Sequence, residues 1–285
     1  MSNWSRAGTT VLVGVLVTAC SSSDGSSGTT GKTITLKTNV SIQDVLSQPK
    51  INAKGWSVVI SQGYLSVGPL YYFTGDPVLS RLTPVRRTRQ SALAWLGDVL
   101  VGSAHAHPGH YIEGAAMGQT LGPTTIDLLG AGIALADGTG VSGLTNSAKF
   151  TWQDPATGNL APLLQGHVVW TQGTATKGDI VIPFIAKADA AEVVDGDQKV
   201  EVAGCSFGVA PGQVGVDMDS DGTVTLTLVP SVWFDQVDFS YVAPGTAGTP
   251  AVDSNGVVDI AGTLAWEGFV RGVKKGTAYL FSYAK

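Results

Sequence analysis

The stretch Lys32-Thr33-Ile34-Thr35-Leu36-Lys37-Thr38-Asn39-Val40 gives the first indication of the fold. Polar side chains alternate with apolar ones, so that Ile34 and Leu36 stand between Thr33, Thr35 and Lys37. A period of two residues is typical of a β-strand with one face in a core and the other toward solvent. The sequence therefore predicts that a β-rich domain begins at this point.

Similar segments follow toward the C-terminus, rich in Val, Ile, Tyr, Phe and Thr and separated by glycine- and proline-containing turns. They are residues 56–60, 64–73, 124–129, 147–152, 166–176, 179–186, 199–207, 223–229, 232–241, 257–266 and 277–283. Short strands at this spacing favour a sandwich or barrel. We expect a mainly β fold over residues 33–285, a β-sandwich of Ig-like or jelly-roll-like type. Two β subdomains are the alternative.

One helix is expected, over Thr88–Val101. Leu93, Leu96, Val99 and Leu100 recur there at steps of three and four residues, which places them on one helical face. This helix and the histidine-rich segment after it would form a connection between β-rich portions, at about residues 88–123.

Residues 1–19 are typical of an export signal. Arg6 supplies a positive charge, and the apolar run Val11–Val17 is shorter than the roughly 20 residues that span a bilayer. The end of this segment, Val17-Thr18-Ala19-Cys20, resembles the lipobox of bacterial lipoproteins, which implies that Cys20 is lipidated. Residues 20–32 are rich in Gly, Ser and Thr, a composition that indicates a flexible linker.

From this N-terminus we expect a protein of the cell envelope, anchored in a membrane through the lipid on Cys20. The sorting preference of enterobacterial lipoproteins, which this N-terminus resembles, implies the outer membrane of a Gram-negative bacterium, because residue 21 is serine and not aspartate.

Composition narrows the function. The net charge of −5, with only 14% charged residues, disfavours nucleic acid as a partner. The sequence has no nucleophile elbow, no HExxH motif and no phosphate-loop glycine spacing, so we expect no enzymatic activity. Of the two cysteines, lipidation would use Cys20, and Cys205 is expected to be a small buried apolar side chain.

The most unusual segment carries three of the four histidines within six positions: His105, His107 and His110. If residues 105–107 are extended, the first two imidazoles project to one side, and the turn dipeptide Pro108-Gly109 can bring the third back to them. Three neutral imidazoles suit copper, zinc, nickel or iron. The alternative is a surface loop whose histidines bind nothing.

Other residues can complete such a site. Tyr111 and Glu113 can add oxygen ligands or orient an imidazole, and His167 can join from the start of a strand. The run Asp217-Met218-Asp219-Ser220-Asp221-Gly222 matches the first half of a calcium loop. Leu228 stands where the bidentate glutamate belongs, so we favour a hairpin turn there.

The segment Ala104-His105-Ala106-His107-Pro108-Gly109-His110-Tyr111, with the lipobox and the aromatic run 64–73, resembles a group of proteobacterial lipoproteins that share this signature. A more distant similarity, in the Tyr64-Leu65-Ser66 strand and in residues 174–178 and 233–234, is to the methanobactin-associated periplasmic copper-binding (MbnP-like) family. This resemblance implies a β-sandwich that handles copper in the periplasm.

Two functions are therefore expected. The first is a lipoprotein that binds copper, or zinc or iron, through the histidine cluster, and that buffers the metal or delivers it to an outer-membrane protein. The second is a metal-free adhesion, carbohydrate-binding or assembly module. In the second case Trp56, Trp152, Trp170, Trp233 and Trp266 can stack on sugars, although tryptophans at strand positions are more often core residues.

Overall fold

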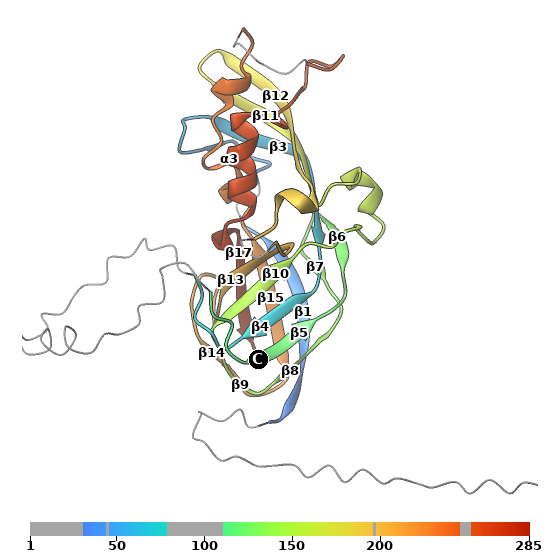
Figure 1. Ribbon diagram of the computed structural model, residues 1–285, viewed down its shortest axis with the longest axis vertical. Helices are drawn as coiled ribbons and strands as arrows, with labels where there is room; N and C mark the ends of the chain where they lie inside the picture. The colour runs from blue at the N-terminus through green and yellow to red at the C-terminus, as the bar shows by residue number, and fades with distance from the viewer. Residues whose placement is uncertain (1–30, 44–45, 79–110, 196–197, 246–251) are drawn as a thin grey trace, which may run out of the picture.

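A computed structural model describes residues 31–43, 46–78, 111–195, 198–245 and 252–285 (Figure 1). The fold is mainly β, as the sequence predicts. The strands form one large closed sheet, drawn in the lower half of Figure 1, and a smaller open sheet above it that is covered by helices. The predicted helix Thr88–Val101, the signal residues and residues 20–30 of the linker lie outside the described residues.

The large sheet has the strand order β15-β17-β13-β10-β4-β5-β8-β1-β7, and β1 also pairs with β15. Its strands are β1 (Thr33–Ile42), β4 (Leu70–Phe73), β5 (Ala116–Thr120), β7 (Ile133–Ala134), β8 (Gly138–Val141), β10 (Ser147–Thr151), β13 (Glu201–Gly208), β15 (Gly222–Leu228) and β17 (Tyr279–Ala284). The pairing of β1 with β15 is parallel and joins Leu36–Ile42 to Gly222–Leu228. It closes the sheet into a ring.

The expectation of a β-sandwich is corrected at this point. A sandwich needs two sheets that stack face to face. In the large sheet, alternate side chains instead point into the ring and fill it: Ile34, Leu36 and Val40 of β1 are buried, whereas Thr33 and Thr35 are exposed. The alternation of polar and apolar residues in β1 does mark one buried face. That face packs against other strands of the same closed sheet and not against a second sheet.

The smaller sheet has the order β16-β12-β11-β3-β2, with β6 also paired to β3. Its strands are β2 (Lys50–Ile51), β3 (Ser57–Val67), β6 (Thr124–Asp127), β11 (Val169–Lys177), β12 (Ile180–Ala188) and β16 (Val258–Asp259). A two-stranded sheet pairs β9 (Gly143–Thr145) with β14 (Val216–Met218).

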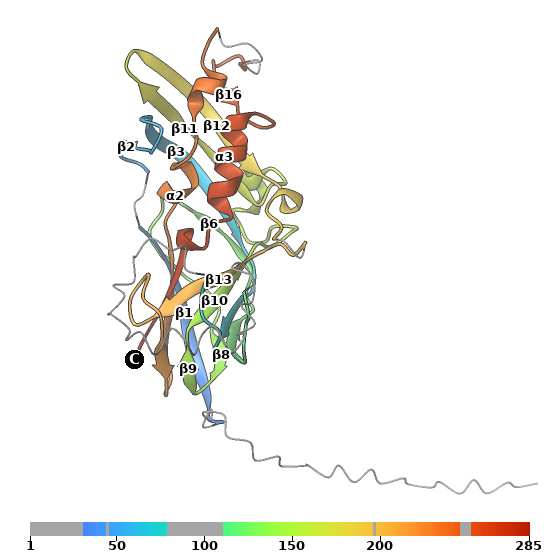
Figure 2. The same cartoon turned by 60° about the vertical axis from the view of Figure 1, so that its left-hand side comes forward.

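Helical segments cover one face of the smaller sheet, as Figure 2 shows for α2 and α3. They are α2 (Ser231–Phe234), α3 (Leu264–Val273) and the 3-10 turn η3 (Phe239–Val242); three further 3-10 turns are η1 (Ala161–Leu164), η2 (Ala190–Glu192) and η4 (Gly276–Ala278). Phe184 of β12 packs on Phe234 and Phe239, with ring centroids 5.6 and 4.8 Å apart.

One predicted strand is wrong, and another, over residues 257–266, is confirmed only at β16. Residues 232–241 contain α2 and η3, and the end of the segment 257–266 is the start of α3. The side chain of Thr263 accepts a hydrogen bond from the backbone N–H of Trp266, which starts a helix where a strand was expected. The expectation of one helix in the domain is corrected for the same reason.

Candidate functional site

The residues on either side of segment 79–110 lie together on the outer face of the closed sheet. The backbone N–H of Gly75 donates to the carbonyl of Glu113 (2.8 Å), and that of Val78 donates to the carbonyl of Gly204 on β13 (2.9 Å). The chain therefore leaves for the histidine-rich segment and returns from it at one place. We call the side chains of Glu113, Lys149 and Glu201, which meet there, the outer-face cluster.

Lys149 lies at the centre of the outer-face cluster. Its neighbours on β10, Ala148 and Phe150, point into the ring, so that Lys149 points outward. It is nevertheless only 6% exposed. Its ammonium pairs with the carboxylate of Glu113, which follows the histidine-rich segment, and with that of Glu201 on β13 at 2.9 Å.

The chemistry of Lys149 is that of a fixed cation. Burial alone would lower its pKa, but the hydrogen bonds from its ammonium to Glu113 and Glu201 outweigh burial and raise the pKa above the usual value. The ammonium also lies 5.5 Å from the centroid of the Phe73 ring. A permanently charged lysine is neither a base nor a nucleophile, and it suits a role as an anchor for carboxylates.

Tyr111 follows His110 directly and is fixed on the same face. Its hydroxyl shares a hydrogen bond of 2.8 Å with the hydroxyl of Ser147, and its ring meets that of Phe73 edge to face. Burial raises the pKa of Tyr111 to about 12, so the phenol stays neutral at physiological pH. Gly204 makes room for this ring, because a Cβ there would lie 3.0 Å from Tyr111 Cδ2 and its φ of +68° disfavours other residues.

The structure describes only two of the five predicted metal ligands, and these two lie apart. His105, His107 and His110, and the lipidation residue Cys20, lie outside the described residues. Glu113 lies beside the closed sheet with its carboxylate on Lys149. His167 lies just before β11 of the open sheet, where its Nδ1 pairs with the carboxylate of Asp189. Within the described ranges, no three His, Cys, Asp or Glu side chains form a group that could hold a metal ion.

Two further sequence interpretations can be compared with the structure. Cys205 is buried and faces Ala148 inside the ring, and burial raises the pKa of its thiol to about 12, which confirms the small buried apolar residue that was expected. The predicted hairpin at residues 217–222 is wrong, because β14 pairs with β9 and not with β15. Asp219 pairs with Lys285, and Asp221 accepts the backbone N–H of Thr35.

The five tryptophans named as possible sugar platforms are buried or partly buried. Trp56, Trp152, Trp170 and Trp233 are buried. Trp266 is partly buried and donates its indole N–H to the carbonyl of Lys187 at 2.9 Å.

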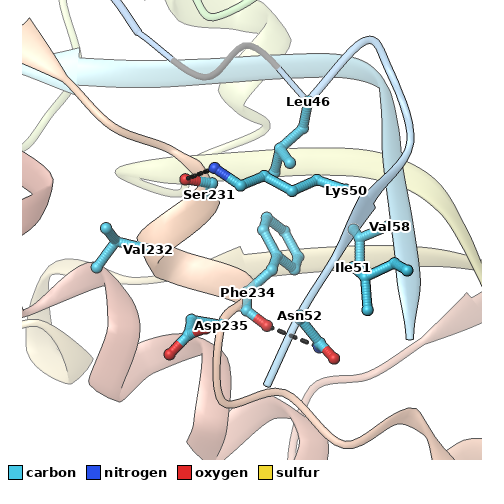
Figure 3. A pocket seen from close by; sticks show the side chains of 9 residues that line it. All are labelled: Leu46, Lys50, Ile51, Asn52, Val58, Ser231, Val232, Phe234 and Asp235. Atoms are coloured by element: carbon cyan, nitrogen blue, oxygen red, sulfur yellow. Dashed lines mark hydrogen bonds between the residues drawn. The ribbon is translucent and has the colours of Figure 1, made fainter. Parts of the chain in front are cut away.

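A small cavity lies between β2 and α2 (Figure 3). Its volume is about 130 Å³, and most of its wall is apolar, with Leu46, Val58 and Phe234 among the lining residues. The ammonium of Lys50 donates to the hydroxyl of Ser231, and the amide of Asn52 donates to the carbonyl of Phe234. Ligand pockets usually measure about 300–1,000 Å³. This cavity is smaller than that range.

A second cavity of about 310 Å³ lies beside α3 and has a polar lining that includes Asp238 and Arg271. It shares no lining residue with the outer-face cluster.

In comparisons with known proteins, no family model, curated protein or solved structure matches this chain. Among the described residues, no helix has the length and apolar character needed to cross a membrane.

Proposed function

We propose that this protein is a lipid-anchored protein of the cell envelope that binds a transition metal through His105, His107 and His110. Copper is the first candidate, because the copper-binding family is the one that the sequence distantly resembles, with zinc and iron as the alternatives. The protein would buffer the ion or deliver it to an outer-membrane partner.

One structural observation supports this proposal: the two sides of segment 79–110 are fastened together on a rigid sheet. Val78 is bonded to β13, Gly75 to Glu113, and Tyr111 to Ser147 of β10. Tyr111, the first described residue after the segment, is therefore held in place against β10. His110 is bonded covalently to the fixed Tyr111, and a restricted ligand loses less conformational entropy when a metal binds.

The donors favoured by this proposal are the three imidazoles. Glu113 is less available, because its carboxylate already pairs with the largely buried ammonium of Lys149. His167 is engaged with Asp189 and lies just before β11 of the open sheet. Glu113 and Tyr111 would instead hold the chain that carries the histidines.

The test uses the full-length protein in detergent. Titration calorimetry and elemental analysis should show one Cu²⁺ or Zn²⁺ bound by the wild type, and loss of the ion as the pH falls toward 5. Protons compete with the metal for neutral imidazoles, whose unperturbed pKa is about 6.5. The triple variant His105→Ala, His107→Ala, His110→Ala should lose binding.

His167→Ala is the matched control, because it removes a histidine that is already paired elsewhere, and its affinity should equal that of the wild type. Equal and weak binding by the wild type and the triple variant would overturn the metal proposal.

The anchor is tested separately by Cys20→Ser. This variant should leave the membrane fraction, because it lacks the thiol that carries the lipid, while the folded domain keeps its melting temperature. Retention of the variant in membranes would remove the lipoprotein part of the proposal without touching the metal part.

A further inference from the structure

The cavity beside α3 lies where three separate parts of the chain meet. Lys54 comes from the turn between β2 and β3, Asp238 and Tyr241 come from the segment around η3, and Glu267 and Arg271 come from α3. Its volume of about 310 Å³ is at the lower limit for small-molecule sites. A volume of this size suits a ligand of one or two sugar rings.

The charges of the cavity are balanced on each side. From α3 come one acid and one base, Glu267 and Arg271, four residues apart. From the β2–β3 turn and η3 come another base and acid, Lys54 and Asp238. A simple anion or cation gains no net attraction from such a lining.

The α3 pair has hydrogen-bonding capacity to spare. In the part of the chain that the structure describes, no hydrogen bond or ion pair engages the side chain of Glu267 or of Arg271, although residues four apart on a helix are neighbours. Both side chains line the cavity.

Asp238, in contrast, is fixed in position. One carboxylate oxygen accepts the indole N–H of the buried Trp56 at 3.1 Å and the backbone N–H of Ser240 at 3.0 Å. Partial burial opposes ionisation, but these hydrogen bonds outweigh it and hold the pKa of Asp238 below its usual value. The carboxylate is therefore a preorganised acceptor at the cavity wall.

Apolar surface lies beside these polar groups. Tyr241 is 45% exposed and Leu264 is 53% exposed, and both line the cavity. An exposed aromatic ring with a neighbouring aliphatic side chain offers a face for the C–H groups of a sugar ring, while the phenol hydroxyl stays available for a hydrogen bond.

We propose that this cavity binds a saccharide, one or two uncharged hexose or N-acetylhexosamine units. Sugar hydroxyls both donate and accept, so they can use the carboxylates of Asp238 and Glu267 and the cations of Lys54 and Arg271 at once. No net charge is needed, which fits the balanced lining. This site is independent of the metal proposal, since none of its residues belongs to the histidine segment or to the outer-face cluster.

The experiment titrates the full-length protein with four probes: chitobiose, maltose, cellobiose and the dipeptide glycylglycine. Binding is followed by saturation-transfer NMR and by titration calorimetry. At least one disaccharide should bind saturably with a millimolar or tighter Kd, and glycylglycine should not. Tyr241→Ala and Arg271→Ala should each weaken that binding about tenfold, the effect of one lost packing contact or charged hydrogen bond.

Lys274→Ala is the matched control, because Lys274 is an exposed cation one residue beyond the end of α3 that does not line the cavity. It should bind the sugar as the wild type does. Circular dichroism establishes that each variant is folded, and both tested side chains are exposed, so folding should be kept. Failure of all three disaccharides, binding unchanged in both variants, or tighter binding of glycylglycine would each overturn the proposal.

Discussion

The closed sheet and the open sheet bury their apolar residues in different ways. The ring is filled by side chains of its own strands, such as Tyr72 and Phe207, whose centroids are 5.2 Å apart. The open sheet cannot enclose its own apolar face. The segments α2, α3 and η3 cover that face with aromatic side chains such as Phe234 and Phe269. Strands with similar patterns of apolar residues can therefore be buried by different partners: by the other strands of the same sheet in one region, and by helices in the other.

The two regions nevertheless share one core. Tyr279 begins β17 of the closed sheet, stacks on Phe150 of β10 at 4.2 Å, and approaches Trp233 of α2 at 6.5 Å. Because these aromatic side chains connect the closed sheet to the helices that cover the open sheet, we expect both regions to unfold together.

The largest effect is expected from Phe269→Ala in the helical cover. Phe269 is fully buried and its ring lies 5.1 Å from that of Phe234. Removing such a side chain costs about 3–5 kcal/mol. Urea unfolding followed by circular dichroism and by tryptophan fluorescence should show this loss in a single transition.

Leu264→Ala, on the same helix but 53% exposed, is the control and should change the stability by at most about 0.5 kcal/mol. Two separate transitions, with only one affected by Phe269→Ala, would show that the closed sheet folds without the cover.

Gly272→Ala should cost about 2–3 kcal/mol through a close contact between helices. In an isolated helix, alanine is favoured over glycine by about 1 kcal/mol. Here, however, a Cβ on Gly272 would lie 2.4 Å from the carbonyl oxygen of Trp233, so α3 must move away from α2. Thermal and urea unfolding measure the effect.

Gly268→Ala sharpens this prediction, because its Cβ would lie 3.0 Å from the carbonyl oxygen of Gln236 and needs a smaller shift. A smaller loss is expected there. A stabilised Gly272→Ala variant would contradict the tight packing of α2 on α3.

The sequence predicted the strands well where their pattern is local. The alternation from Thr33 to Val40 and the paired runs 166–176 and 179–186 correspond to β1, β11 and β12. The closure of the ring was not predictable, because Leu36 and its partner Gly222 are far apart in the chain and no local pattern specifies which strands pair. A sandwich was expected because the pairing of β1 with β15, which closes the sheet, could not be predicted.

The helical cover was missed for a different reason. Val237 follows Trp233 by four residues and Phe234 by three, which fits a helix, but all three lie among residues that favour strands. At the candidate site, Tyr111 and Glu113 were singled out from the sequence, whereas Lys149 was not. A lysine in a predicted strand is usually solvent-exposed, and only the register that sets Thr151 opposite Glu201 brings an acid beside it.

Lys149→Met tests the closed-sheet side of the comparison, and a loss of about 2 kcal/mol is expected at pH 7. Breaking a buried ion pair costs about 3–5 kcal/mol, and we expect less here because the Glu113 side chain is 41% exposed. The pKa of Lys149 is raised above 10.5 in the folded protein. Its contribution is therefore fully present below pH 10.5 and is lost as the pH rises through the folded value.

Urea unfolding at several pH values checks this sign. The difference between the wild type and Lys149→Met should stay constant from pH 7 to about pH 9 and shrink above pH 10.5. A difference that grows with alkaline pH would contradict the assignment of Lys149 as the anchoring cation.

The smallest effect on stability is expected from Glu113→Gln. This variant tests whether the Glu113 carboxylate serves only to pair with Lys149 or also binds the metal. Lys149 keeps its bond to Glu201, and an ion pair with a partly exposed carboxylate contributes at most about 1 kcal/mol. Glu201→Gln, whose side chain is 11% exposed, should cost more. If Glu113 only pairs with Lys149, the copper affinity measured by calorimetry should change less than about twofold in Glu113→Gln. A loss of tenfold or more, equivalent to about 1.4 kcal/mol, would instead make Glu113 a metal ligand, and the carboxylate would then have to leave Lys149 when the ion binds.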